Sequence, residues 1–229
     1  MQLALNIHLP ETATLAAFIA ADNADLVALL NAMALGHSEL QAYVWGESGV
    51  GKTHLLQAAC HVANSAGLRS VYIPLDVAMS YGANALEGLD ALDLVCLDEL
   101  HLLAGQADWE RALFNLINEL RSRQARLILA SRKPVSYAWQ LADLQSRLSW
   151  GPVYQLRSLS DQQKAEVLIK RAALRGLVLK EDVADYMLSR YPRNLAILCD
   201  ILQTLDRASL AEQRALTIPF VKQILAQQA

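Results

Sequence analysis

The segment GESGVGKT at residues 46–53 carries residue types that can bind phosphate, and it matches the pattern GxxxxGK[ST] in full. Glycines let successive backbone N–H groups curl around phosphate oxygens, while the lysine reaches the β- and γ-phosphates and the hydroxyl can hold Mg²⁺. A helix predicted to begin at Thr53 turns its positive end toward the anion. The alternative is an ordinary glycine-rich turn, but the position between a predicted strand and helix favours a phosphate-binding loop. The predicted nucleotide ligands are Gly46, Ser48, Gly49, Val50, Gly51, Lys52, Thr53 and His54.

An acidic pair follows a second apolar run. In LVCLDEL (94–100), four apolar residues precede Asp98 and Glu99. A carboxylate at the end of a strand beside the phosphate-binding loop can hold Mg²⁺, so Thr53 and Asp98 are the predicted metal-binding residues. Glu99 can polarise an attacking water. The alternative is an acidic pair that caps a helix. His101 is interpreted as a packing residue rather than a ligand.

Three other polar residues stand at informative positions. Ser131 ends an apolar strand and can reach the γ-phosphate, although a strand running into a polar loop explains it equally well. Arg147 lies in LQSRLSWG, at the end of a predicted helix, and Arg193 lies at the predicted start of another. Taken singly, each is an ordinary surface arginine. Beside a complete phosphate-binding loop, one is expected at a subunit boundary and the other over the nucleotide.

The elements that must position these residues alternate between strand and helix. Apolar runs predict strands at 41–45, 70–74, 92–100, 126–131 and 153–156, and helical spacing predicts helices at 11–35, 53–67 and 108–124. Strands that alternate with helices indicate an α/β fold with a parallel sheet covered on both faces. Beyond Leu156 the pattern becomes purely helical, at 160–175, 180–190, 193–209 and 217–226. We therefore expect an α/β domain at 11–158 and a small all-helical domain at 159–229.

Composition excludes several classes of protein. The formal net charge is −3, with −6 in residues 1–156 and +3 in residues 157–229, which argues against a non-specific DNA binder. The three cysteines are far apart and form no CxxC, so free thiols, buried in a reducing compartment, are expected. There is no signal peptide pattern and no apolar run long enough to cross a bilayer. We expect a cytoplasmic protein.

The sequence resembles the AAA+ family through residues that follow the family's order over essentially the whole chain, namely the phosphate-binding loop, Asp98, Glu99, Ser131, Arg147 and Arg193. Within that family, GESGVGKTHLLQA, LQSRLSWG and the segment from Tyr191 onward are similar to the bacterial replication initiator DnaA. DRASLAEQRALTIPFVKQIL (206–225) is similar to the Hda family of DnaA-homologous regulators. DnaA also carries a partner-binding N-terminal domain and a C-terminal helix-turn-helix domain. We expect no helix-turn-helix domain here, because residue 229 directly follows the helical domain. We also expect no N-terminal partner-binding domain.

The resemblance implies a fold, a function and ligands. The fold is an AAA+ module with a helical lid, and the ligands are ADP or ATP with Mg²⁺. The implied function is negative regulation of replication initiation: the ADP-bound protein docks on the DNA-loaded sliding clamp, the β subunit of DNA polymerase III, and stimulates hydrolysis of DnaA-bound ATP. Arg147 would be an arginine finger acting in trans, and Arg193 would contact the chain's own nucleotide. DNA is reached mainly through the clamp, and the possibility of a homodimer stays open.

Two segments bear on that implication. Residues 18–23 loosely resemble the stretch that lines the adenine pocket. The first sensor segment of DnaA reads roughly Thr-Ser-Asp, whereas this chain has Ala130-Ser131-Arg132. Arg132 in place of an acid makes the usual kind of ATP sensing doubtful. Conversely, Lys52, Asp98 and Glu99 form an intact ATPase set, so the sequence leaves weak intrinsic hydrolysis open. We expect weak or no intrinsic ATPase activity.

The first ten residues, MQLALNIHLP, alternate like a strand, and their predicted role depends on the resemblance. In isolation they read as an edge strand on this chain's own sheet. Bacterial clamp-binding peptides share forms such as QLxLxL, in which the glutamine bonds the rim of a groove and the apolar residues enter it. The predicted clamp-binding residues of this tail (1–10) are Gln2, Leu3, Leu5 and Ile7. Asn6 stands where many such peptides have Pro or Phe.

Two alternative functions remain at this level. One is an autonomous AAA+ ATPase that depends on its own hydrolysis cycle. The other is a DnaA-like accessory initiation factor that binds DNA directly, which needs a basic surface or a helix-turn-helix. Intrinsic ATP turnover would favour the first, and salt-dependent DNA binding without a clamp would favour the second.

Overall fold

The computed structural model describes residues 9–10 and 13–226 of the 229-residue chain. The chain divides into two compact units. The first contains residues 1–47 and 52–157, and the second contains residues 158–229 together with the short loop segment 48–51. Each unit has its own hydrophobic core and is described separately below.

The first unit is built on a five-stranded parallel sheet with the order β2-β3-β4-β1-β5. This confirms the predicted α/β class. All five strands lie where apolar runs predict them, with ends trimmed by one to two residues in the third and fifth. Their bounds are β1 Gln41–Trp45, β2 Ser70–Pro74, β3 Leu94–Asp98, β4 Arg126–Ser131 and β5 Val153–Gln155. The carboxyl ends of β1 and β4 are adjacent, because Trp45 pairs with Ser131.

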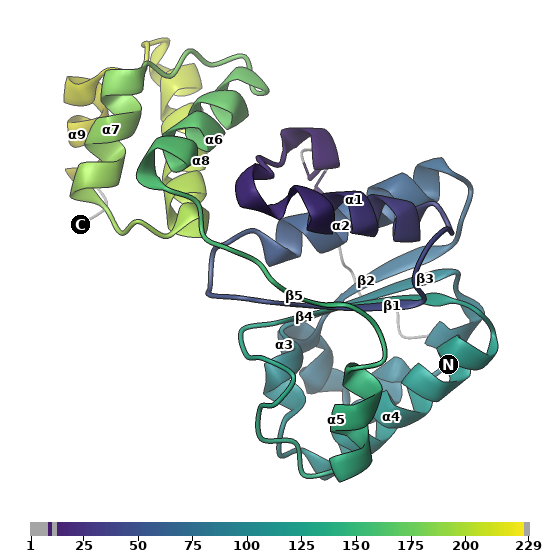
Figure 1. Cartoon of the computed structure of the whole chain (residues 1–229). Coiled ribbons are helices and arrows are strands. Elements are labelled where there is room, and N and C mark those ends of the chain that lie inside the picture. The colour runs from purple at the N-terminus through teal and green to yellow at the C-terminus, as the bar shows by residue number, and fades with distance from the viewer. Residues whose placement is uncertain (1–8, 11–12, 227–229) are drawn as a thin grey trace. The chain divides into compact units, whose positions relative to one another are not determined.

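Helices cover both faces of this sheet (Figure 1). On one face lie α1 (Ala24–Ala34) and α2 (Lys52–Ser65), and on the other lie α3 (Leu75–Ala78), α4 (Ala107–Ser122) and α5 (Ala142–Leu148). Leu127 and Leu129 pack with α4 in one core cluster, whereas the alternating Ile128 is not part of it, as the two-residue period of a strand requires. Short 3₁₀ helices fill the connections, at Leu15–Ala17, Ala21–Asn23, Met79–Tyr81, Ala83–Leu86, Leu89–Ala91 and Leu100–Leu103.

The single helix predicted over residues 11–35 is wrong in its first half. Among the described residues of this segment, the α-helix covers only Ala24–Ala34, and two 3₁₀ turns precede it. The Thr14 hydroxyl accepts a hydrogen bond from Ala17 N and caps the start of the first turn, which ends at Phe18. The Asn23 side chain makes two hydrogen bonds with the backbone of Arg157. Its Nδ2 donates to the Arg157 carbonyl at 3.3 Å, and its Oδ1 accepts from Arg157 N at 2.9 Å. These tertiary bonds outweigh a helical propensity that is worth only tenths of a kcal/mol per residue.

The second unit is all helical, as predicted. It consists of α6 (Asp161–Ala173), α7 (Glu181–Arg190), α8 (Leu195–Glu212) and α9 (Ile218–Ala226). A capping box starts α6: Ser160 Oγ accepts from Gln163 N, while the Gln163 side chain accepts from Ser160 N. The four helices bury one apolar stripe each around a shared core that includes Met187, Leu202 and Phe220.

The cysteines are free, as predicted, but not all of them are buried. Cys60 and Cys96 are buried in the α/β unit, whereas Cys199 on α8 is only half-buried. The stripe of α8 that enters the core contains Leu198, Leu202 and Leu205, and Cys199 lies at its margin. Within the described part of the chain, no helix is long and apolar enough to cross a membrane.

Candidate nucleotide-binding site

The phosphate-binding motif starts at the carboxyl end of β1 and runs into α2. Gly46 N donates to the Ser131 carbonyl at 3.2 Å, which ties the start of the loop to the end of β4. Gly49 and Gly51 have φ angles of 81° and 106°, a region that glycine adopts without steric cost. The motif therefore has the strand–loop–helix context that phosphate binding requires.

Lys52 is buried at the base of this loop, with 5% of its surface exposed. Its Nζ donates to the carbonyls of Gly46 at 2.8 Å and Glu47 at 2.7 Å. Burial lowers the pKa of Lys52, and the nearby carboxylates of Glu99 and Asp98 oppose that effect. An ammonium held among carbonyls in a low-dielectric site is well placed to pair with phosphate oxygens.

Asp98 is the centre of a buried hydrogen-bond cluster. Its Oδ2 accepts from Thr53 Oγ1 at 2.6 Å and from the Tyr72 hydroxyl at 3.0 Å, and its Oδ1 accepts from Glu99 N at 2.8 Å. Burial raises the pKa of Asp98, and the bond from Thr53 opposes that rise. The structure thus brings together the two predicted metal-binding residues, Thr53 and Asp98. Tyr72 was not among the predicted residues, because a tyrosine in an apolar strand reads as core.

Tyr72 and Tyr43 provide a matched test of this cluster. Tyr72 donates to the carboxylate of Asp98, whereas Tyr43 donates to the neutral carbonyl of Lys133 at 2.9 Å. Tyr72→Phe is expected to destabilise the fold by about 1.5–3 kcal/mol and Tyr43→Phe by about 1 kcal/mol, because bonds to charged groups are stronger. Urea unfolding at pH 7, followed by tryptophan fluorescence, checks this, since all four tryptophans lie within residues 45–150. Equal losses would contradict the role assigned to Tyr72.

Glu99 lies directly after β3 in the left-handed conformation, with φ 58°. Its carboxylate faces the guanidinium of Arg132, with Arg132 Nε 2.9 Å from Oε2 and Arg132 Nη2 3.3 Å from Oε1. His101 Nδ1 lies 3.5 Å from Oε2, and burial lowers the pKa of His101. The predicted catalytic carboxylate is therefore paired with Arg132, the residue that replaces an acid of DnaA in this segment.

Ser131 is fully buried at the end of β4. Its Oγ accepts from Lys133 N at 3.0 Å, so the hydroxyl is bonded to the turn that follows the strand. Beside it, burial raises the pKa of Tyr43 to about 12. Ser131 lies next to the start of the phosphate-binding loop, because its carbonyl accepts from Gly46 N. Its contact with a γ-phosphate stays a prediction.

His54 follows the loop on α2 and contacts residues of the N-terminal segment. Its ring stacks on Phe18, with 5.8 Å between ring centroids, and its Nε2 lies 2.8 Å from the Thr14 carbonyl. Phe18 belongs to the stretch predicted to line an adenine pocket. The structure brings this stretch to the first turn of α2, and its role in binding adenine stays a prediction.

Arg147 lies in the last turn of α5, as predicted, and is held by aromatic rings. Its guanidinium lies 4.0 Å from the centroid of Trp150 and 5.3 Å from that of Phe114, and its Nε is buried without a hydrogen bond. Its carbonyl accepts from Gln41 Nε2 at 2.8 Å. A side chain at Gly151 would collide with the Gln41 carbonyl, so glycine is required where this segment passes β1. Arg147 is thus anchored at both backbone and side chain.

Glu110 supports the helix that carries Arg147. Although it is a charged residue on α4, only 1% of its surface is exposed. Its carboxylate accepts from the backbone N–H groups of Gln140 at 3.1 Å and Leu141 at 2.7 Å, directly before α5, and from Gly105 at 2.8 Å. A buried carboxylate on these N–H groups caps α5 in place of a side-chain cap of its own. The sequence alone does not predict this role for Glu110, because an acid on an amphipathic helix is usually exposed to solvent.

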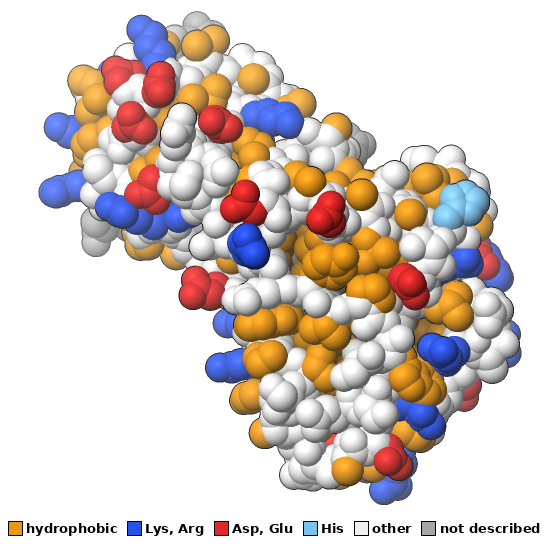
Figure 2. Space-filling model, in the orientation of Figure 1, with side chains coloured by type: hydrophobic (Ala, Val, Ile, Leu, Met, Phe, Trp, Pro, Cys, Tyr) orange, Lys and Arg blue, Asp and Glu red, His pale blue; other side chains and the backbone are white. Residues whose placement is uncertain are grey.

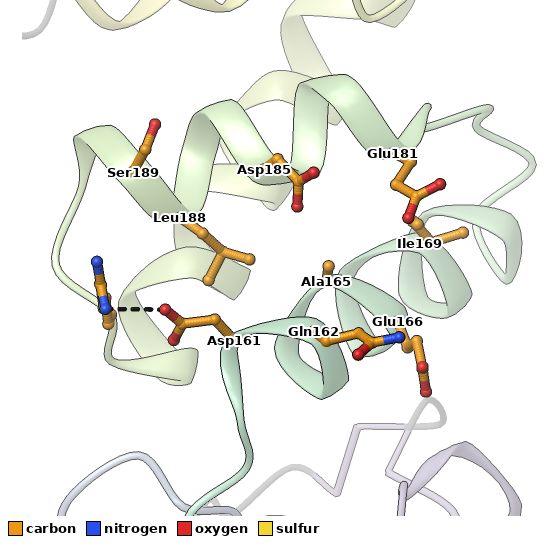
Figure 3. Close-up of a pocket in the computed structure, with 10 residues that line it drawn as sticks. Asp161, Gln162, Ala165, Glu166, Ile169, Glu181, Asp185, Leu188 and Ser189 are labelled. Carbon is orange, nitrogen blue, oxygen red and sulfur yellow. Dashed lines mark ion pairs between the residues drawn. The ribbon is translucent and has the colours of Figure 1, made fainter.

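Arg193 belongs to the helical unit and lies just before α8 rather than on it. The helix begins later than predicted because Asn194 caps it, accepting from Ala196 N at 2.9 Å. Arg193 Nη1 pairs with Asp161 Oδ2 at 2.8 Å, at the edge of a cavity of about 390 Å³ between α6 and α7 (Figure 3). Most of the charged residues that line the cavity are acidic, and Asp185 and Glu181 point into the same space. It contains none of the phosphate-binding residues.

The predicted clamp-binding residues lie outside the described residues. Gln2, Leu3, Leu5 and Ile7 are all in the segment 1–8, so their role stays a prediction.

Comparison with known families matches nearly the whole chain. Residues 11–155 match the family described as the bacterial DnaA ATPase domain, which is more than half of the sequence. The chain belongs to this family. Residues 161–225 match a second family, described as the Hda lid domain, so the α/β unit and the helical unit are both covered. The chain is therefore a DnaA-related AAA+ protein of the Hda type, as the sequence resemblance predicts.

Solved structures agree on the fold. Domain III of the Thermotoga maritima replication initiation protein DnaA superposes with a TM-score of 0.80 at 21% identity, covering 96% of this chain and 98% of that one. AMPPCP-bound DnaA from Aquifex aeolicus gives 0.69 at 24% identity over 86% and 66%. A variant of Thermotoga maritima RuvB gives 0.68 at 18% over 96% and 73%. At these identities the likeness establishes an AAA+ fold and nothing finer.

Proposed function

We propose that this DnaA-related AAA+ protein is a nucleotide-bound negative regulator of replication initiation that stimulates hydrolysis of the ATP held by DnaA. The observation that carries the proposal is the pairing of a DnaA-type ATPase domain with an Hda-type lid in one chain. The proposed domains are a clamp-binding tail at 1–10, the nucleotide-binding domain at 11–158 and the lid at 159–229.

The proposed ligand is ADP or ATP with Mg²⁺. Two of the similar DnaA structures are bound to AMPPCP, a nucleotide analogue, which supports nucleotide binding by this relative. The fit is good, because the Thr53 hydroxyl and the Asp98 carboxylate are 2.6 Å apart and are the oxygen ligands that Mg²⁺ prefers. Within the described residues no cluster of three or more His, Cys, Asp or Glu could hold a metal. Nucleotide phosphates and water would therefore complete the magnesium shell.

Arg147 is the proposed arginine finger, supplied in trans to ATP bound by DnaA. Arg147 lies in the last turn of a short helix. Trp150 contacts its guanidinium and Gln41 donates to its carbonyl, and these contacts hold the backbone at this point in one conformation. A guanidinium offered to the transferring phosphoryl group neutralises charge that develops in the transition state. For this action the side chain has to leave the aromatic rings, whose cation–π attraction is worth only about 0.5–2 kcal/mol.

The proposed route to replicating DNA is the sliding clamp, bound through Gln2, Leu3, Leu5 and Ile7. Direct DNA binding is the weaker alternative, because the net charge is −3. On the face shown in Figure 2, basic and acidic side chains are interspersed over the helical unit rather than collected in one stripe. A basic stripe is the usual footprint of a nucleic-acid-binding domain.

The test of this route is stimulated hydrolysis with and without clamp. The 229-residue chain, with ADP, is added to DnaA loaded with ATP, on DNA with or without loaded clamp. Stimulation is expected only with loaded clamp, and the double variant Gln2→Ala and Leu3→Ala is expected to lose at least about tenfold, the effect of removing two central anchors of a peptide interface. His8→Ala, in the same tail but outside the segment 2–7 that fits the motif, is the control. Equal stimulation by all three proteins would overturn clamp docking.

A further inference from the structure

The Glu99–Arg132 pair forms where two neighbouring strands end. Glu99 follows β3 and Arg132 follows β4, and these strands are adjacent and parallel. Their carboxyl ends therefore meet at one edge of the sheet, beside the phosphate-binding loop. The guanidinium approaches side-on, so that two of its nitrogens face the two carboxylate oxygens, at 2.9 and 3.3 Å. The Nη2–Oε1 contact is a hydrogen bond, whereas Nε and Oε2 form an ion pair in which Oε2 accepts no hydrogen bond.

The pair occupies the atoms that hydrolysis would need. ATP hydrolysis forms a bond between a water oxygen and the γ-phosphorus, and it breaks the bond from that phosphorus to the β,γ-bridging oxygen. The water must give up a proton, which a carboxylate such as Glu99 can accept if one of its oxygens reaches the water. Here Arg132 faces both oxygens, and His101 approaches Oε2 from another direction at 3.5 Å.

We propose that Arg132 sequesters Glu99 and so suppresses hydrolysis of the nucleotide bound by this chain itself. Arg132 is then a positioning residue that acts through Glu99 rather than a catalytic one. This gives the protein a stable nucleotide state while its effect is exerted on the ATP of a partner. The inference rests on the nucleotide binding in the proposed function, but neither on the clamp nor on DnaA.

The solvent exposure of Arg132 and Glu99 determines how strongly the pair suppresses hydrolysis. The Arg132 side chain is 49% exposed and that of Glu99 is 21% exposed, so solvent weakens their attraction. The pair therefore lowers the fraction of molecules with a free Glu99 without eliminating it. A general base contributes 10²–10⁴-fold to a rate, and we expect release of Glu99 to recover about ten- to a hundredfold.

The experiment uses the purified full chain alone. Binding of ATP with Mg²⁺ is measured first, and then single-turnover hydrolysis of bound ATP is followed for the wild type, Arg132→Ala and Arg132→Lys. Arg132→Ala is expected to raise the rate about ten- to a hundredfold. Arg132→Lys is expected to give a smaller rise, because lysine keeps the positive charge near Glu99 but not the planar guanidinium. The double variant Arg132→Ala with Glu99→Gln is expected to lose the gain.

A matched control removes another arginine of the same sheet. Arg69 pairs with Asp93 at 3.3 Å, at the opposite end of β3, and Arg69→Ala is expected to hydrolyse ATP like the wild type. If Arg132→Ala binds ATP and hydrolyses it no faster than the wild type, the inference is overturned while nucleotide binding stands. A slower rate would overturn it too, by making Arg132 a direct phosphate contact. A wild type that binds ADP but not ATP would overturn the inference and leave the proposed function standing, whereas a wild type that binds neither nucleotide would overturn the proposed function itself.

Discussion

Arg147→Ala is expected to reduce stimulated hydrolysis of DnaA-bound ATP by about 10³-fold or more, while ADP binding by this chain is unchanged. An arginine finger is worth 10³–10⁵ in rate, because it neutralises charge that develops on the transferring phosphoryl group. The loss of packing should be small, since the guanidinium contributes a partly exposed cation–π contact worth about 1 kcal/mol with Trp150. Stimulation is measured with ATP bound to DnaA, and folding by thermal denaturation.

Two variants separate the finger from a general loss of charge. Arg123→Ala removes an exposed arginine that pairs with Asp90 at 2.8 Å, and it should stimulate normally. Arg147→Lys keeps the charge but not the planar fork, and should recover only a small part of the rate. Normal stimulation by Arg147→Ala would remove Arg147 from the mechanism, whatever the other variants do.

Lys52→Ala is expected to weaken ADP binding by about 10²-fold or more. Loss of one member of a buried charge pair typically costs 2–5 kcal/mol, and each 1.4 kcal/mol is tenfold in affinity. Lys52 is 5% exposed and sits against the carbonyls of Gly46 and Glu47, where no other described lysine stands. Titration of the protein with ADP and Mg²⁺ measures the effect. Stimulated hydrolysis of DnaA-bound ATP should also decrease at ADP concentrations that do not saturate the variant.

The control for Lys52 is Lys222→Ala. Lys222 is exposed on α9 in the helical unit, with its ammonium 5.4 Å from the ring centroid of Tyr186. It should bind ADP like the wild type. If Lys52→Ala also keeps full affinity, the segment 46–53 is a glycine-rich turn and the nucleotide assignment fails.

Sequence periodicity predicted the sheet well, because parallel strands covered on both faces read as short continuous apolar runs. All five strands and the four helices of the second unit lie within a few residues of their predicted bounds. Periodicity does not predict the structure where a side chain forms hydrogen bonds with the backbone of a residue far away in the sequence. Asn23 bonds Arg157, 134 residues away, and breaks the helix predicted at 11–35.

The candidate site was predictable only where a motif fixes the spacing. The loop at 46–53, Asp98 and Arg147 follow recognisable patterns. Tyr72, Glu110 and the Arg132 partner of Glu99 do not, since each acts through contacts between strands or helices far apart in the sequence. Strand order brings β3 and β4 together, and no local pattern in the sequence encodes that order.

The central claim is most directly tested by the fate of labelled ATP carried by DnaA. DnaA loaded with radiolabelled ATP is mixed with this protein, itself saturated with unlabelled ADP, on DNA bearing loaded clamp. We predict that the label becomes ADP that stays on DnaA, and that Arg147→Ala prevents the conversion. Label that remains ATP, or leaves DnaA as intact ATP, would contradict the claim.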